Sequence, residues 1–257
     1  MEKATQPRAF YGSFFHTPAY GSFEYLERAL IEVGEDGAIE RVIAHDDPDQ
    51  AAALAKAREA GTLYELGEGR FGLPGFVDIH IHSPQWPQAA LALDEPLYRW
   101  LDERTFPLES KFADVDFAKK VYSDLVDQLL ARGSTTAVYL GSAHLEATVA
   151  LAEICAERGQ RALVGKTVMD DPAANPDYYR DASPEQAVRD IETLIREVEA
   201  IGRKSRAGAW PVITPRFIPS CTDEVLRGLG NLAESTGAYV QTHCNEGQWE
   251  HDVVFPL

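Results

Sequence analysis

The sequence predicts an α/β fold in which a small β-rich domain precedes an incomplete (β/α)8 barrel. Residues 10–72 hold short strand-like runs separated by turn residues. After residue 82, runs of β-branched residues alternate with amphipathic helices, which is the pattern of repeated βα units. We therefore expect a small β-rich domain over residues 1–72 and a barrel domain over residues 73–257.

The first domain is expected to contain three strands and one helix. The strand-like runs cover residues 10–15, 30–33 and 39–44. A helix is predicted over residues 48–60, because Asp47 is suited to an N-cap and Pro48 to the first helical turn.

The second domain is expected to contain five βα strands. A capping box, Ser183-Pro184-Glu185-Gln186, predicts that a helix starts at residue 183. About five βα units are predicted, whereas a closed barrel needs eight strands over about 250 residues, so the barrel is incomplete. The predicted strands cover residues 75–81, 135–140, 162–169, 212–217 and 238–243, and the helices cover residues 114–130, 144–157, 183–198 and 222–237.

Composition excludes several classes of function. Twenty-four basic and 41 acidic side chains give a net charge of −17, which would repel a nucleic acid. Neither a signal peptide nor an apolar run of about 18 residues is apparent, so we expect a cytoplasmic protein with no membrane partner. The three cysteines are widely spaced, which favours reduced thiols over disulfides or a cysteine-rich zinc site.

His80 and His82 close the predicted strand over residues 75–81 and are the first candidates for chemistry. Residues two apart in a strand point to the same face, so both imidazoles can reach one metal ion. A histidine pair without a metal is the ordinary alternative for this spacing. The carboxyl end of a buried parallel strand is where functional residues gather, which favours the metal site.

His243 ends the fifth predicted strand, and Glu246 follows three residues later. Three histidines from one sheet rim suit a divalent metal such as zinc with an open position for water. The carboxylate is close enough to that water to act as a proton shuttle. A hydrogen-bonded loop pair made by His243 and Glu246 remains an alternative.

Arg216 and Phe217 end the fourth predicted strand, and Gln85 follows His82 by three residues. Arginine presents a planar fork of donors to a heteroaromatic ring, and phenylalanine presents a stacking face. The Gln85 amide can read a base edge with its donor and its acceptor. A structural salt bridge for Arg216 and a core position for Phe217 are the alternatives.

Several stretches together resemble guanine deaminases of the amidohydrolase superfamily. The similarity spans nearly the whole chain, and the H-x-H strand alone indicates only the superfamily. The stretches that carry it are PGFVDIHIH (74–82), TFPLE (105–109), GQRA (159–162), TPRF (214–217) and HCNE (243–246).

The resemblance implies a zinc-dependent enzyme with a (β/α)8 barrel of the metal-dependent hydrolase type and a small composite β-sandwich domain. Such an enzyme hydrolyses guanine to xanthine and ammonia in purine catabolism or salvage, usually as a homodimer. It implies one zinc per subunit on His80, His82 and His243, with Glu246 as the proton shuttle. It also implies a substrate pocket made by Gln85, Arg216, Phe217, Trp100 and Leu101.

The sequence departs from the family at its far end. Members complete the metal site with a further histidine and an aspartate from later strands, and this chain ends at Leu257 before either is expected. We therefore doubt that the 257-residue chain is fully active alone. The alternatives are another mononuclear amidohydrolase that deaminates a different heterocycle, or an inactive fragment that acts only as part of an oligomer.

Overall fold

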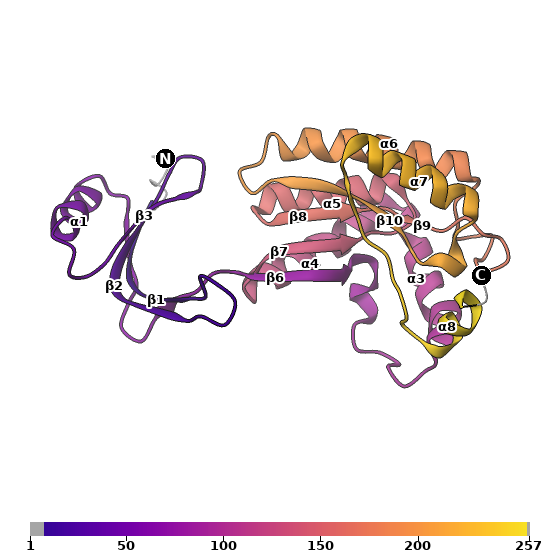
Figure 1. The fold of residues 1–257 in the computed structure, drawn as a ribbon, viewed down its shortest axis with the longest axis horizontal. Coiled ribbons are helices and arrows are strands. Elements are labelled where there is room, and N and C mark those ends of the chain that lie inside the picture. Colours follow the sequence, from indigo (N-terminus) through magenta and orange to yellow (C-terminus); the bar gives the residue numbers. More distant parts are fainter. Residues whose placement is uncertain (1–7, 256–257) are drawn as a thin grey trace. The chain divides into compact units, whose positions relative to one another are not determined.

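The computed structural model describes residues 8–255, which fall into two compact units, Met1–Gly75 and Phe76–Leu257. The first unit is a β-rich module (Figure 1). Its sheet has the order β3-β2-β1-β4, and β5 also pairs with β1. Its elements are β1 (Ala9–His16), β2 (Glu24–Val33), β3 (Ile39–Ile43), α1 (Gln50–Glu59), β4 (Leu63–Glu65) and β5 (Phe71–Gly72).

The helix of the small unit begins later than its sequence suggests. Asp47 does not cap it, because the Asp47 carboxylate accepts the backbone N–H of Asp49 at 2.8 Å within the preceding turn. Asp49 is the N-cap residue, although its side chain makes no capping hydrogen bond. The first compact unit ends at Gly75, and its residues Leu73 and Pro74 line the apolar groove of its sheet.

The large unit is built on a parallel sheet with the strand order β11-β10-β8-β7-β6 and with β9 paired to β10. The strands are β6 (Phe76–His82), β7 (Ser134–Leu140), β8 (Arg161–Gly165), β9 (Thr167–Val168), β10 (Ala209–Pro215) and β11 (Tyr239–Val240). The longer helices are α4 (Val115–Ala131), α5 (Leu145–Arg158), α6 (Pro184–Gly202) and α7 (Asp223–Thr236).

Shorter helical segments follow β6 and β11. The 3-10 segment η1 (Ser83–Gln88) comes directly after β6. The remaining segments are α2 (Leu97–Trp100), the π-helical η2 (Leu101–Thr105), α3 (Phe106–Glu109), the 3-10 turns η3 (Ser110–Ala113) and η4 (Ile218–Ser220), and α8 (Gln248–Val254).

The core of the large unit lies between this sheet and helices α4 to α7 (Figure 1). Tyr139 of β7 and Ile213 of β10 are fully buried against Leu151 of α5 and Ile191 of α6. The α/β fold with parallel strands and covering helices is therefore confirmed, and it is consistent with part of a barrel.

Three predicted strands of the large unit differ from the observed ones. The run over residues 212–217 is observed as β10, which ends at Pro215, so Arg216 and Phe217 follow the strand instead of ending it. The run over residues 162–169 is split into β8 and β9 at Lys166, whose buried ammonium forms an ion pair with Asp181. The run over residues 238–243 forms only the short strand β11. His243 lies beyond it, where its backbone N–H donates to the Arg216 carbonyl at 3.1 Å.

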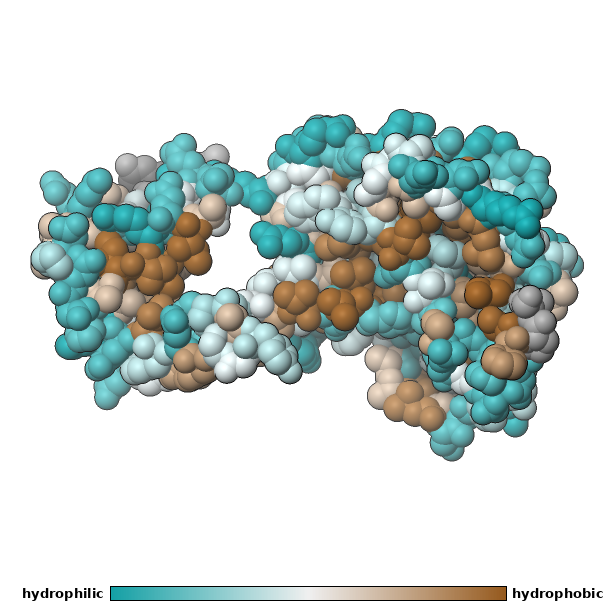
Figure 2. All heavy atoms as spheres, viewed as in Figure 1, coloured by the Kyte–Doolittle hydropathy of each residue, from teal (hydrophilic) through white to brown (hydrophobic). Residues whose placement is uncertain are grey.

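Apolar side chains remain exposed on strands of both units. In the small unit they gather over the sheet, in a groove of about 750 Å³ (Figure 2). In the large unit the edge strand β6 exposes Val77 and Ile79, which are 61% and 74% exposed. Among residues 8–255, no helix combines the length and the apolar character that a bilayer crossing requires.

Candidate active site

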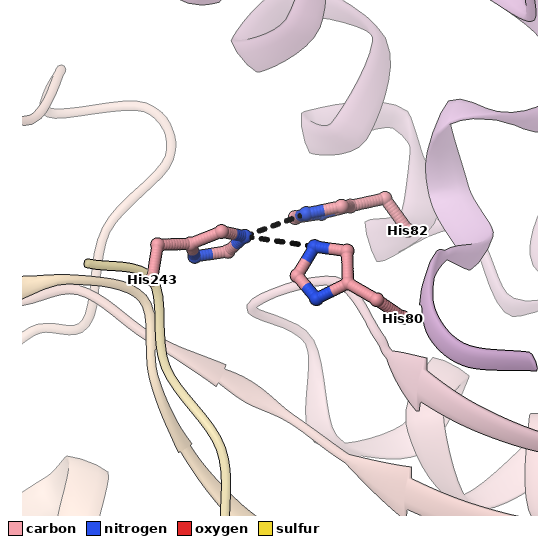
Figure 3. A group of neighbouring side chains, drawn as sticks. All are labelled: His80, His82 and His243. Atoms are coloured by element: carbon pink, nitrogen blue, oxygen red, sulfur yellow. Dashed lines mark hydrogen bonds between the residues drawn. The ribbon is translucent and has the colours of Figure 1, made fainter. Parts of the chain in front are cut away.

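Three histidines converge at the carboxyl end of the parallel sheet (Figure 3). His80 and His82 are two apart on β6, and His243 comes from the loop after β11. The His243 Nε2 atom lies 2.9 Å from Nε2 of His82 and 3.2 Å from Nε2 of His80. The sequence prediction that these three side chains meet is therefore matched by the geometry.

The tautomer of His243 is set by the backbone. Its Nδ1 lies 2.6 Å from the Arg216 carbonyl oxygen, so Nδ1 carries the proton and donates it. The lone pair is then on Nε2, which faces the other two rings. A backbone acceptor behind a ligating histidine is the usual means of fixing ring orientation at a metal.

The other two imidazoles are held in the neutral form. Burial lowers the pKa of His80, and the neighbouring His243 lowers it further. Burial lowers the pKa of His82 well below its ordinary value, with the charge of Arg216 as the next cause. Neutral imidazole is the form that binds metals.

The three nitrogens fit a metal ion. The single lone pair on Nε2 of His243 can accept only one hydrogen bond, so hydrogen bonding alone does not hold both of the other nitrogens against it. Zinc–imidazole bonds of about 2.0–2.1 Å place tetrahedral ligand atoms about 3.3 Å apart. The observed separations of 2.9 and 3.2 Å are close to that value.

A cavity of about 250 Å³ opens beside the histidines. It is bounded by all nine residues that the sequence singled out and by Leu97 of α2. The lining residues are His80, His82, Gln85, Leu97, Trp100, Leu101, Arg216, Phe217, His243 and Glu246.

Glu246 is an exposed residue of the loop between β11 and α8. Its backbone N–H donates to the buried carboxylate of Glu250 at 2.7 Å, which ties the loop to α8. The Glu246 carboxylate is near enough to His80 to favour the charged form of that imidazole. It therefore lies beside the histidine cluster at the cavity.

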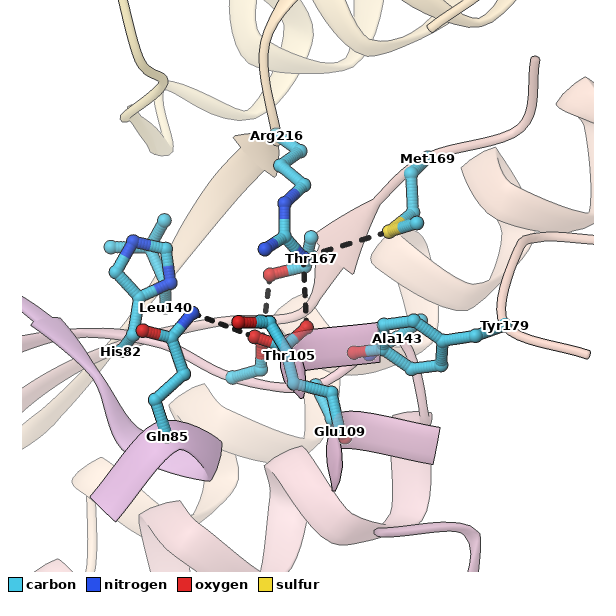
Figure 4. A network of polar contacts seen from close by, with 12 residues as sticks. His82, Gln85, Thr105, Glu109, Leu140, Ala143, Thr167, Met169, Tyr179 and Arg216 are labelled. Atoms are coloured by element: carbon cyan, nitrogen blue, oxygen red, sulfur yellow. Dashed lines mark hydrogen bonds and ion pairs between the residues drawn. The ribbon is translucent and has the colours of Figure 1, made fainter. Parts of the chain in front are cut away.

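A buried polar network forms the wall opposite the histidines (Figure 4). Glu109 is 1% exposed and uses both carboxylate oxygens. Its Oε1 accepts from Nε2 of Gln85 at 2.8 Å, and its Oε2 accepts from Nη1 of Arg216 at 2.8 Å. The arginine is thus paired structurally and also lines the cavity, so the two interpretations of Arg216 are compatible.

The Arg216 guanidinium is held on further sides by Phe106 and Met169. Its Cζ lies 5.1 Å from the centre of the Phe106 ring, and Nη1 lies 3.7 Å from the Met169 sulfur. Burial works against the charge, but the carboxylate of Glu109 outweighs it and raises the pKa of Arg216. Arg216 is therefore a fixed cation at the cavity wall.

Glu109 is the site residue that the sequence analysis missed. It was noticed only as part of the TFPLE stretch and was given no role. An acidic residue within a short apolar segment indicates a buried carboxylate, and a carboxylate is buried only when it has a partner. The sequence alone did not name that partner, which lies 107 residues away.

The fold and the site together define a class of protein, an α/β unit that carries three histidines at the carboxyl ends of its parallel strands. A model of the amidohydrolase family matches residues 71–255, and the chain belongs to that family.

Guanine deaminases are among the proteins to which this chain is similar. The chain is 37% identical to guanine deaminase of Dictyostelium discoideum over 97% of its length and 56% of the relative. It is 35% identical to guanine deaminase of Mus musculus, over 96% of this chain and 53% of the relative. It thus spans about half the length of these curated relatives.

A solved structure agrees with this similarity. Guanine deaminase from C. acetobutylicum with guanine bound in its active site superposes with a TM-score of 0.84 and 31% identity. The match covers 97% of this chain and 55% of that one.

Proposed function

We propose that the protein is a zinc-dependent guanine deaminase that hydrolyses guanine to xanthine and ammonia in purine catabolism or salvage. The observation that carries the proposal is the convergence of His80, His82 and His243 beside a cavity walled by Gln85 and Arg216. The guanine deaminases among its relatives and the guanine-bound structural neighbour support the choice of substrate.

His80, His82 and His243 would hold one zinc ion per subunit through their Nε2 atoms. When bound, the zinc would lower the pKa of a water molecule and so supply the nucleophile at neutral pH. The Arg216 carbonyl keeps His243 in the ligating tautomer.

Glu246 would be the catalytic acid and base. An exposed carboxylate at the cavity edge can take a proton from the attacking water and pass it to the purine ring nitrogen. It can then assist the departure of ammonia.

Three side chains would hold the purine. Arg216 would donate hydrogen bonds to ring acceptors, Gln85 would read a base edge, and Phe217 would stack on the ring. Trp100 and Leu101 would close the cavity on its apolar side.

The remaining features of the proposal concern the whole protein. We propose a (β/α)8 catalytic barrel from residue 73, a composite β-sandwich that includes residues 1–72, a homodimer and a cytoplasmic location. The match to the amidohydrolase family and the β-rich first unit support the barrel and the sandwich.

Zinc binding tests the metal site first. The purified chain, treated with chelator and dialysed against zinc, is expected to retain about one zinc, measured by atomic absorption. His82→Ala and His243→Ala are expected to abolish this retention. His45→Ala, an exposed histidine of the small unit, is the matched control and should retain the metal. Equal retention by all variants would remove the metal centre from the proposal.

Turnover tests the substrate. The zinc-loaded chain is offered guanine, adenine, cytosine and an aminated triazine, and ammonia release is measured. Release from guanine supports the proposal, whereas release from another heterocycle alone would assign a different deaminase. Zinc retention without any turnover would favour the fragment that acts only within an oligomer.

A further inference from the structure

We infer that Glu109 is a positioning residue that fixes how Gln85 and Arg216 present hydrogen-bonding groups to the ligand and thereby sets purine specificity. The inference rests on the proposed function and deepens it. Glu109 does not line the cavity, so it acts through the two residues that do.

Glu109 is hydrogen-bonded to Gln85 and to Arg216 at the same time. Gln85 comes from η1, Arg216 follows β10, and Glu109 ends α3, so one carboxylate joins three separate segments. Each of its oxygens accepts one hydrogen bond of 2.8 Å. A carboxylate that is 1% exposed and bonded to a buried guanidinium has little freedom to turn.

The chemistry of a carboxylate then determines the orientation of the Gln85 amide. An ionised carboxylate only accepts hydrogen bonds, so Gln85 must present its NH₂ group to Glu109. The amide oxygen is left on the side of His82, as Figure 4 shows. Among residues 8–255 this oxygen has no hydrogen-bond donor, so it is available as an acceptor to a ligand.

The Arg216 guanidinium is fixed through Nη1, which contacts Glu109 and Met169. Its Nε and Nη2 form no side-chain hydrogen bond within the described part of the chain, so they are available as donors. At this wall the cavity therefore offers an acceptor from Gln85 and donors from Arg216. A ligand edge that matches this pattern places an N–H group against Gln85 and an acceptor against Arg216.

Guanine has such an edge, because its 6-oxo acceptor lies beside ring and exocyclic N–H donors. In 2,6-diaminopurine the 6-oxo group is replaced by an amino donor, and the adjacent ring nitrogen becomes an acceptor. The arrangement around Glu109 should therefore reject 2,6-diaminopurine. Mismatched polar groups in a buried site are costly, so the preference should be large.

Glu109→Gln tests the inference because the new amide both donates and accepts. Gln85 can then turn its amide, and Arg216 loses its charged partner. We expect the preference for guanine over 2,6-diaminopurine, measured as the ratio of dissociation constants, to fall about tenfold or more. Binding to the zinc-loaded full chain is followed by stopped-flow tryptophan fluorescence, since Trp100 lines the cavity.

The matched control is Glu103→Gln, which alters a carboxylate that is 49% exposed and paired with Arg99. It should leave the ratio unchanged. A purely structural role for Glu109 would weaken both ligands equally, so an unchanged ratio in folded Glu109→Gln protein would overturn the inference. In a Gln85→Ala background, Glu109→Gln should alter the ratio by less than it does alone, and an equal change would also count against it.

A second measurement does not depend on a folded variant. The side-chain NH₂ of Gln85, assigned with Gln85→Ala, is expected to exchange slowly with solvent in the ¹⁵N NMR spectrum of the wild-type chain. Rapid exchange would overturn the inference. Failure of the wild-type chain to bind guanine would instead remove the proposed function, while the NMR result would still decide whether Glu109 holds Gln85.

Discussion

Gly165 lies at the end of β8, where this strand passes very close to β10. A Cβ atom there would meet the Val212 carbonyl oxygen at 2.6 Å and would collide with the Thr214 hydroxyl. The carbonyl belongs to the backbone and cannot move aside without shifting β10. Gly165 therefore permits the close approach of two strands that lead to the site.

Gly165→Ala is expected to destabilise the protein by about 1–3 kcal/mol, because an extra methyl group in a tightly packed core forces backbone shifts. Urea unfolding followed by circular dichroism measures the change. Gly230→Ala in α7 is the control, since a Cβ there meets nothing within 4 Å and alanine favours the helix. Equal effects of the two substitutions would contradict the close-approach argument.

The three cysteine thiols are expected to differ in their reactivity towards thiol reagents. Burial raises the pKa of Cys155 to about 12 and that of Cys221 to about 11, whereas Cys244 is exposed. Only the thiolate is nucleophilic, and at pH 8 the two buried groups remain protonated. Ellman's reagent should therefore modify one thiol rapidly in the native chain and all three after denaturation. Cys244→Ser should remove the rapid phase, and its persistence would show that a buried thiol is reactive.

At the scale of elements, the helices were predicted well because their ends carry local signals. Asp114 caps α4 by accepting the N–H groups of Asp116 and Phe117, and Gly159 ends α5 in the left-handed conformation. Such signals act within a few residues of chain, so the sequence displays them directly.

Ser183 provides a test of one of these signals. Its hydroxyl accepts the Gln186 N–H at 3.2 Å at the start of α6. Ser183→Ala should cost about 1 kcal/mol of unfolding free energy, because the amide loses its partner. Ser183→Asn preserves an acceptor and should be close to wild type in chemical denaturation. A loss of the same size in both variants would mean that the cap is unimportant.

The features that the sequence does not predict depend on contacts between distant residues. Lys166, at the break between β8 and β9, pairs with Asp181, and His243, beyond the short strand β11, donates its backbone N–H to the Arg216 carbonyl. The histidine site was predictable because a strand imposes a two-residue period on His80 and His82. Glu109 was not, since its partners are fixed only by the tertiary fold.

At the scale of the whole molecule, exposed strand edges predict association of the 257-residue chain. Val77 on β6 and Val240 on β11 are 61% and 56% exposed, and each strand lies at an end of the sheet order. Unpaired edges with apolar side chains pair readily with other chains.

We expect light scattering coupled to size exclusion to detect dimers or larger species, and Val77→Lys with Val240→Lys to reduce them. Asn231→Lys places the same charge on an exposed position of α7 and should have no such effect. A monodisperse wild-type monomer with a cooperative thermal transition would contradict this expectation.

Arg216 contacts the histidine cluster and the cavity through different parts of the same residue. Its carbonyl oxygen accepts the Nδ1–H of His243, while its guanidinium is bonded to Glu109. A side-chain substitution such as Arg216→Ala removes the guanidinium, together with the charge that lowers the pKa of His82, but keeps the carbonyl that every amino acid has. The ring orientation of His243 should therefore survive such a substitution, whereas a displacement of the backbone here would disturb the ring and the cavity wall together.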